Sequence, residues 1–118
     1  MNVKATSHER GIAAEKAAEI FLRAKGYEIL ERRYKTPVGE IDIIALDDDY
    51  VVFIEVKARA AIDDALYSIT PRMRARINDA ASYYIMLNPD KAGMAMRFDV
   101  MAVQLPFRIQ HMENAFME

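Results

Sequence analysis

Two apolar segments of this chain carry acidic residues at positions where packing alone would favour hydrophobic ones. The first segment reads Gly39-Glu40-Ile41-Asp42-Ile43-Ile44, and the second reads Ile54-Glu55-Val56-Lys57. An ionised group in a buried strand is costly unless it is paired, hydrogen-bonded or bound to a metal. An aspartate followed by Glu-x-Lys at the end of the next strand is the set of groups that a metal-dependent phosphodiesterase needs.

The loop between these segments decides whether their carboxylates can cooperate. Strand side chains alternate between faces, so Glu55 and Lys57 point the same way near the end of their strand. If the Asp-rich loop is a turn of two or four residues, Asp42 lies directly opposite Glu55 on the same face. A three-residue loop without a bulge would pair Asp42 with Ile54 and place it on the other face. The metal-site hypothesis therefore requires a particular hairpin.

The candidate site residues are Asp42, Glu55, Lys57 and Glu15. Carboxylate oxygens without sulfur or histidine suit Mg²⁺ or Mn²⁺ rather than zinc, with Asp42 and Glu55 as ligands. Lys57 would orient or deprotonate a water molecule and offset developing charge. Glu15, from an alanine-rich helix, is the fourth expected member and could hold a metal-bound water or a second ion. The structural alternative is a buried network that only fixes the sheet register, with Glu15 as a solvated helix residue.

Cationic residues near the Glu-x-Lys segment are candidates for nucleic-acid contact. Arg72 and Arg76 lie one helical turn apart and share a face, and Arg59 precedes them. They could bind a phosphate backbone near a helix N-terminus. The alternative for the helix is a solvated face with an Arg76–Asp79 ion pair.

Three further titratable residues receive ordinary interpretations. His8 and His111 show no ligand spacing and are expected to be surface residues. Asp99 lies inside a strand-like segment, and pairing with Arg97 or a backbone donor is the simplest explanation of its charge there.

The periodicity predicts the order α-β-β-β-α-β. Thr6 and Glu9 form a capping box before a helix that continues over residues 13–25. Strands are expected over 27–34, 40–46, 50–58 and 96–104, with a short fifth over 107–111. Residues 59–69 are expected to form a loop, and Thr70-Pro71 begins the second long helix. This pattern predicts an α/β fold with a mixed sheet and helices packed on it.

Composition limits the class of protein. The 118 residues suit one domain spanning 1–118, and 53% hydrophobic with 29% charged residues is typical of a globular chain. The chain has no cysteine and no apolar run long enough to cross a membrane, which together favour a cytoplasmic location. Its net charge of −2 means that any nucleic-acid contact must be local.

The chain resembles the YraN family of uncharacterised bacterial proteins, within the PD-(D/E)XK nuclease superfamily. The resemblance rests on residues 11–15, 25–30, 34–44 and 52–59, and continues at 70–72, 97–100 and 114–116. It implies a restriction-endonuclease-like fold, related to that of archaeal Holliday-junction resolvases, with Glu15, Asp42, Glu55 and Lys57 as the active-site set and Mg²⁺ as cofactor. The chain departs from the expected pattern at residues 60–67, where an apolar stretch replaces a polar, glycine-containing loop expected to border the site.

Three functional hypotheses follow. The first is a Mg²⁺-dependent endonuclease acting on structured or branched DNA, with a homodimer as a possible assembly. The second is a nucleic-acid-binding or assembly module that keeps the fold without cleaving. The third is a protein-binding role for the Met- and Phe-rich tail, which contains Phe107, Ile109, Met112, Phe116 and Met117.

Overall fold

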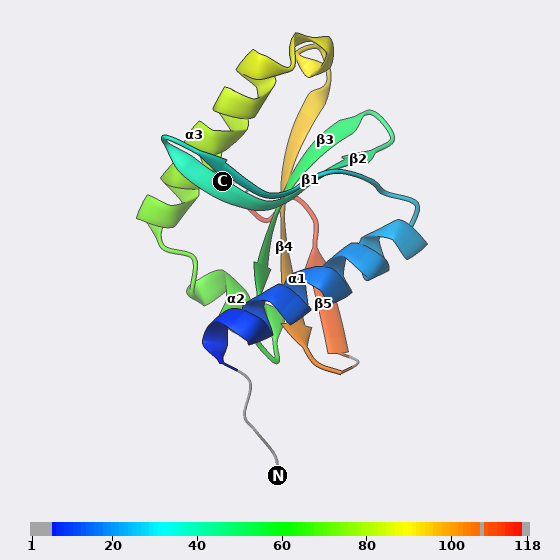
Figure 1. Cartoon of the computed structure of the whole chain (residues 1–118), viewed down its shortest axis with the longest axis vertical. Helices are drawn as coiled ribbons and strands as arrows, with labels where there is room; N and C mark the ends of the chain where they lie inside the picture. Colours follow the sequence, from blue (N-terminus) through cyan, green and yellow to red (C-terminus); the bar gives the residue numbers. More distant parts are fainter. Residues whose placement is uncertain (1–5, 107, 117–118) are drawn as a thin grey trace.

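The computed structural model describes residues 6–106 and 108–116 of the chain. Its secondary structure follows the expected order, including the short fifth strand, and contains two short helices in addition (Figure 1). The elements in chain order are α1 (Ser7–Ala24), β1 (Glu28–Thr36), β2 (Gly39–Asp47), β3 (Tyr50–Lys57), α2 (Ile62–Tyr67), α3 (Pro71–Leu87), the 3-10 helix η1 (Pro89–Lys91), β4 (Ala95–Gln104) and β5 (Arg108–Met112). No helix in this described part is long and apolar enough to cross a membrane.

The sheet has five strands in the order β1-β2-β3-β4-β5, and only β3 and β4 are parallel. The two parallel strands are connected through α2 and α3, as a parallel pair requires a crossover. The expected α/β architecture, a mixed sheet flanked by helices, is therefore confirmed.

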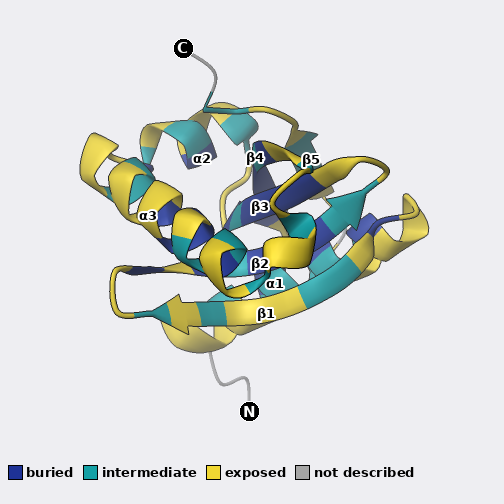
Figure 2. Cartoon of the chain, turned by 90° about the horizontal axis from the view of Figure 1, so that it is seen from above, coloured by how far each residue is buried: buried dark blue, intermediate teal, exposed yellow. Residues whose placement is uncertain are grey.

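Each face of the sheet is covered by different helices. The α1 face packs Ala14, Ala18 and Leu22 against alternate residues of the central strands. The opposite face packs Ile77, Ala80, Ala81 and Tyr84 of α3 against the remaining ones. In Figure 2 the buried residues concentrate on β2, β3 and β4, whereas β1 is mostly exposed. The core thus consists of two apolar layers with the sheet between them.

Local sequence signals explain where the long helices begin. The Thr6 side chain accepts a hydrogen bond of 3.0 Å from the Glu9 N–H, and the Glu9 carboxylate faces the Thr6 N–H, which completes the capping box. At α3, the Thr70 hydroxyl accepts from the Met73 N–H at 3.1 Å, with Pro71 at the first helical position. Both predicted helix starts are confirmed.

The expectation of a loop over residues 59–69 is wrong, because α2 forms there. Its Ala65 is fully buried against Val100 and Ala102 of β4, and the Ile62 N–H donates to Gln110 Oε1 at 2.6 Å. The helix is only six residues long and lacks a side-chain cap, so its formation depends on this packing rather than on local propensity. The apolar character of residues 60–67 therefore has a structural role.

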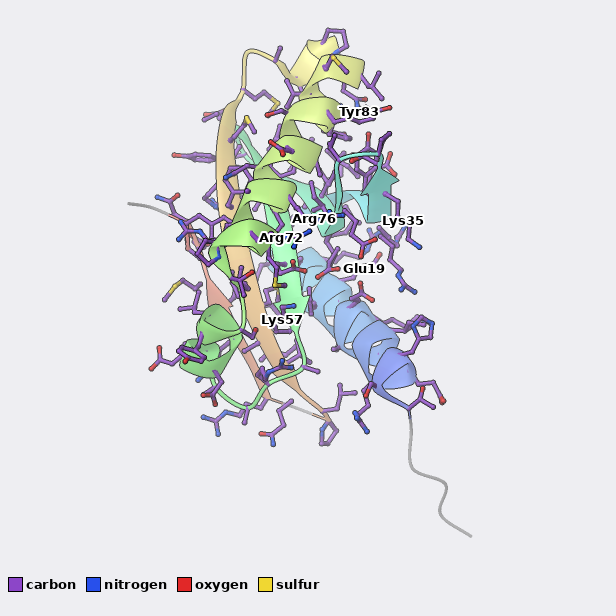
Figure 3. The ribbon with its side chains drawn as sticks, turned by 90° about the vertical axis from the view of Figure 1, so that its left-hand side faces the viewer. Glu19, Lys35, Lys57, Arg72, Arg76 and Tyr83 are labelled. Atoms are coloured by element: carbon purple, nitrogen blue, oxygen red, sulfur yellow. The ribbon has the colours of Figure 1, made fainter. Side chains whose placement is uncertain are left out.

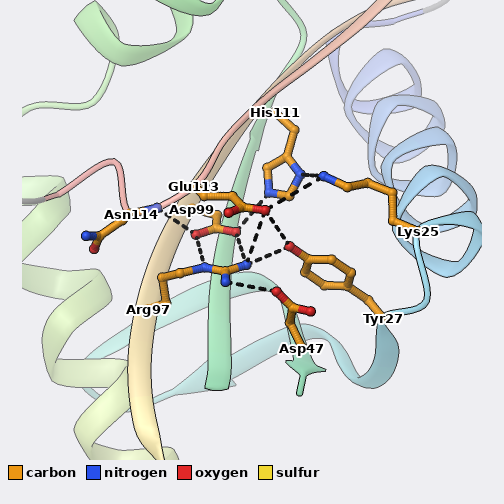
Figure 4. A network of polar contacts seen from close by, with 8 residues as sticks. All are labelled: Lys25, Tyr27, Asp47, Arg97, Asp99, His111, Glu113 and Asn114. Atoms are coloured by element: carbon orange, nitrogen blue, oxygen red, sulfur yellow. Dashed lines mark hydrogen bonds and ion pairs between the residues drawn. The ribbon is translucent and has the colours of Figure 1, made fainter. Parts of the chain in front are cut away.

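A buried polar network joins β4 and β5 to the start of β1 (Figure 4). Asp99, 1% exposed, accepts from Arg97 Nε at 2.9 Å, from the Asn114 N–H at 2.9 Å, and contacts His111 Nε2 at 2.8 Å. Burial opposes the charge of Asp99, but hydrogen bonds from His111 and Arg97 hold its pKa below the usual range. The predicted pairing of Asp99 with Arg97 and a backbone donor is confirmed.

The expectation that His111 is an ordinary surface residue is wrong. Its side chain is 3% exposed and lies between Asp99 and Lys25, with Lys25 Nζ 2.9 Å from Nδ1. The neighbouring tail residue Phe116 stacks on Phe98 at 5.7 Å between ring centroids. These contacts account for Phe116 through packing, whereas Phe107 and Met117 lie outside the described residues.

Candidate active site

The β2–β3 hairpin has the register that a shared acidic site requires. Asp47 pairs with Tyr50 across the two-residue turn Asp48–Asp49, and Ile43 pairs with Ile54. The same register places Asp42 opposite Glu55. The two-residue turn was one of the loop lengths that the sequence allowed, and the structure selects it.

The predicted division of β3 between two faces is confirmed. Val51 and Phe53 pack in the α3 layer, whereas Val52, Ile54 and Val56 pack in the α1 layer. Glu55 and Lys57 continue the α3 face beyond the point where the apolar layer ends. They line a cleft of about 390 Å³ whose wall residues are Glu40, Asp42, Glu55, Lys57, Met73, Arg76 and Ile77.

Asp42 is fixed at the junction of β2 and β3. Its Oδ2 accepts a hydrogen bond of 2.8 Å from the N–H of Val56, the residue between Glu55 and Lys57. Burial, followed by a hydrogen bond to Glu55 and repulsion from its carboxylate, raises the pKa of Asp42 to about 8. Asp42 therefore holds a proton near neutral pH, despite the usual acidity of aspartate.

Glu15 reaches the same point from α1. Its neighbours Ala14 and Ala18 are buried against the sheet, and these small side chains let the helix lie close to the strands. The Glu15 carboxyl lies within hydrogen-bonding reach of Asp42 and 3.9 Å from Arg33 Nε. Burial, followed by repulsion from Asp42, raises the pKa of Glu15 to about 7. The structure thus brings Glu15, Asp42 and Glu55 together, with Asp42 in the middle.

The donor set consists of hard carboxylate oxygens, which suits Mg²⁺ or Mn²⁺ in kind. Across residues 6–106 and 108–116, however, no group of three or more Asp, Glu or His side chains is arranged to hold a metal ion. Burial raises the pKa values of Glu15 and Asp42, so protons on these two carboxyl groups would compete with a bound cation. A bound cation would have to displace those protons.

Three cationic side chains lie around the opening between α1 and α3. Figure 3 shows Lys57, Arg72 and Arg76 there, with Glu19 on the α1 side. None of the three makes an ion pair with another described residue. The alternative Arg76–Asp79 pair is absent from the described structure, so these charges are available to an anionic ligand.

Gly39 fixes how closely α3 approaches the site. A Cβ at this position would overlap the backbone carbonyl of Arg76. The absence of a side chain therefore lets the start of β2 lie directly against α3, which carries Arg76 into the cleft.

Arg59 is not brought to this cleft. It lines a separate hollow of about 260 Å³ near Arg10, Val103 and Leu105. The segment after it does not border the cleft either, because α2 packs on β4 and β5 instead. The expectation that residues 60–67 border the site is therefore wrong.

Sequence reasoning missed two residues near the site. Glu40 lines the cleft beside Asp42. Arg33 lies opposite Asp42 in the β1–β2 register and has a left-handed backbone, with φ of 48°. A left-handed arginine inside a strand is uncommon, and strained backbone is often found next to functional residues. The periodicity of the sequence contains no signal that predicts this left-handed backbone at Arg33.

Comparison with known proteins identifies the family of this chain. The model of the uncharacterised protein family UPF0102 matches residues 14–103. The chain belongs to this family. A UPF0102 protein of Rhodopseudomonas palustris strain HaA2 is 48% identical over 113 residues, covering 96% of this chain and 88% of the relative. Another, from Nitrobacter winogradskyi, is 41% identical over 115 residues, covering 97% of each. The YraN resemblance drawn from residues such as 34–44 is confirmed.

This UPF0102 protein is also similar, more remotely, to a solved structure described as an EndoMS–dsDNA2 complex. It shares 18% identity with a TM-score of 0.39, and the match covers 92% of this chain. This chain spans about half, 49%, of the length of that protein. A likeness at this level carries no argument about activity.

Proposed function

We propose that this UPF0102 protein is a divalent-cation-dependent nuclease that hydrolyses phosphodiester bonds in structured or branched DNA. One observation carries the proposal: Asp42 lies between the carboxyl groups of Glu15 and Glu55, and it lines one cleft together with Glu55, Lys57 and Arg76. The resemblance to PD-(D/E)XK nucleases at these same residues supports it.

Ionising several neighbouring carboxyl groups at this site costs free energy. Three acidic groups that meet at a half-buried point repel one another when ionised and lose hydration. Strongly perturbed carboxyl groups in a cleft are candidates for function. A purely structural role explains less, since the Val56 N–H already fixes Asp42 to β3, whereas two further carboxyl neighbours repel Asp42 when the groups are ionised.

Asp42, Glu55 and Glu15 would hold Mg²⁺ or Mn²⁺ once Glu15 and Asp42 have lost their protons. The ion would supply Lewis-acid stabilisation of charge at phosphorus and a more acidic water. The residues of the chain would do the remaining work. The Lys57 ammonium group would orient the attacking water and offset the negative charge that develops on the phosphate oxygens while the bond from phosphorus to the leaving oxygen breaks.

The cationic residues of α3 would hold the substrate. Arg76 lines the cleft and Arg72 lies one turn earlier, both near the positive end of the helix. Contacts of this kind position a phosphate backbone without reading its sequence. They also explain how a chain with net charge −2 could bind DNA, since the positive charge needs to be local only.

A second candidate is a module that binds nucleic acid without cleaving it. The observation in its favour is that no three acidic side chains in the described ranges are arranged to hold a metal ion. On this hypothesis, the protonated carboxyl groups remain paired with one another, and only Arg72 and Arg76 contact the ligand.

Calorimetric titration with Mg²⁺ and Mn²⁺, followed by cleavage assays of the same samples on branched and linear DNA, tests the proposal. Wild type should bind the ion and cleave, whereas Asp42→Asn should do neither. Asp79→Asn, an exposed aspartate on α3, is the matched control and should behave as wild type. Ion binding with no cleavage of any DNA, or cleavage that survives in Asp42→Asn, would contradict the proposal. DNA binding by a wild type that binds no ion would favour the second candidate.

A further inference from the structure

A second hollow adjoins the cleft on the other side of Asp42. It has a volume of about 190 Å³ and lies between α1 and the β1–β2 hairpin. Its lining consists of Ile12, Glu15, Lys16, Glu19, Arg32, Arg33, Asp42 and Ile43. Asp42 lines both spaces, so a ligand in the cleft lies directly beside the hollow.

The hollow combines apolar walls with cationic groups. Ile43, 2% exposed, belongs to the α1 layer of the core, whereas Ile12 is 40% exposed and has no place in that layer. An exposed isoleucine beside a candidate site gives a ligand an apolar contact that the protein does not use itself.

The charges around the hollow divide into two groups. Glu19 is occupied by Arg23 at 3.1 Å and by a close contact with Arg32. Lys16 is exposed, and the Arg33 side chain is 46% exposed with only a 3.9 Å approach to Glu15. Lys16 and Arg33 therefore present cations to a phosphate at the edge of the hollow.

We propose that this hollow receives one unstacked nucleobase of the substrate strand, next to the phosphate that occupies the cleft. The inference rests on the proposed nuclease function and specifies its substrate. A volume of 190 Å³ corresponds to about six water molecules at about 30 Å³ each, which suits a single ring system rather than a stacked pair. Apolar contact with Ile12 would hold the base, and Lys16 or Arg33 would contact its phosphate.

The substrate class follows from this placement. Bases inside a continuous duplex stay stacked and paired, and taking one out costs energy unless it is already unpaired. A strand with an unpaired nucleotide beside the cleavage position, as in a single strand or at a junction, enters the hollow without that cost. The enzyme should therefore prefer such a strand to a continuous duplex.

Abasic substitution tests the inference. Cleavage of a single-stranded DNA of about 12 nucleotides first locates the bond that wild type breaks. Anisotropy then measures binding of Lys57→Ala to the same DNA with one abasic position on either side of that bond. At one of these positions, loss of the base should weaken binding by about fivefold, equivalent to about 1 kcal/mol.

Two neutral variants assign the effect to the hollow. With Ile12→Gln added, intact and abasic DNA should bind equally, because the apolar contact is gone. With Ile20→Gln, a change at an isoleucine of the same helix that is 66% exposed and outside the hollow, the fivefold difference should persist. Cleavage by wild type with no dependence on the base at either position would overturn the inference and leave the proposed function standing. If only branched DNA is cleaved, the same abasic substitutions are made beside the bond broken there. Absence of both binding and cleavage on the single strand and on branched DNA would overturn both.

Discussion

Asp42 accepts a hydrogen bond from the backbone N–H of Val56, so its carboxyl group is held between Glu55 and Lys57. This bond connects two strands at the point where their ladder ends. The bond by itself lowers the pKa of Asp42, but burial and the neighbouring Glu55 outweigh it and raise that pKa to about 8. The carboxyl group of Asp42 therefore lies where repulsion from neighbouring carboxyl groups destabilises its ionised form.

Replacing Asp42 should stabilise the protein at alkaline pH. The pKa of Asp42 is about 8 in the folded protein against 3.8 in an unstructured chain, so the folded state holds a proton that the unfolded state releases. The free energy of unfolding, measured without divalent cations, should therefore fall as pH rises from about 4 to about 8. Asp42→Asn should be more stable than wild type by about 2 kcal/mol at pH 8. Urea unfolding at several pH values measures this, and a wild type with the opposite pH trend would refute it.

Metal affinity should increase with pH. Glu15 and Asp42, with pKa values of about 7 and 8, must lose protons before they can bind a cation. Calorimetry with Mg²⁺ should therefore show tighter binding at pH 8.5 than at pH 6, together with proton release that depends on the ionisation enthalpy of the buffer. Binding that is independent of pH over this interval would mean that other groups hold the ion.

Removing Lys57 should affect turnover more than metal binding. Lys57 lines the cleft without an ion pair to the described residues, so Lys57→Ala should leave the fold intact. We expect cleavage to slow by at least about a hundredfold, a loss typical of a missing group that stabilises charge in the transition state. Mg²⁺ affinity should stay within a few fold of wild type. Lys35→Ala, on exposed β1, is the control and should retain full activity.

The salt dependence of DNA binding should distinguish the arginines. Arg72→Ala combined with Arg76→Ala should reduce the slope of log affinity against log salt by about 1 to 2, as expected for the loss of phosphate contacts. Arg59→Ala should change the slope little, because Arg59 lines a separate hollow. A similar reduction of the slope in Arg59→Ala would mean that DNA contacts both the cleft and the hollow beside Arg59.

The buried network around Asp99 should control stability rather than activity. Asp99→Ala leaves the guanidinium of Arg97 buried without its bidentate partner, and such losses cost about 3 to 5 kcal/mol. Asp90→Ala, which removes a solvent-screened pair with Lys91, should change the melting temperature little. Thermal unfolding of both variants checks the difference. Similar melting temperatures would mean that the network contributes little.

Local sequence signals determined the parts of the structure that depend on neighbouring residues. The Thr6 and Thr70 caps, the Asp48–Asp49 turn and the alternation along β3 each involve groups only a few residues apart. Backbone propensity and side-chain periodicity act over this distance, so the caps and the alternation could be predicted. The sequence left the length of the turn open, and the opposition of Asp42 and Glu55 required a turn of two or four residues.

Tertiary structure decided which distant side chains meet. Packing of alanines in α1 brought Glu15 to Asp42, and the route of the chain through α2 took Arg59 away from the cleft. Burial of His111 against Asp99 depends on the pairing of β5 with β4. Such contacts join elements far apart in sequence, and their energy comes from packing rather than from local pattern. The sequence therefore indicated the acidic residues of the hairpin, whereas tertiary packing decided which side chains from other elements lie next to them.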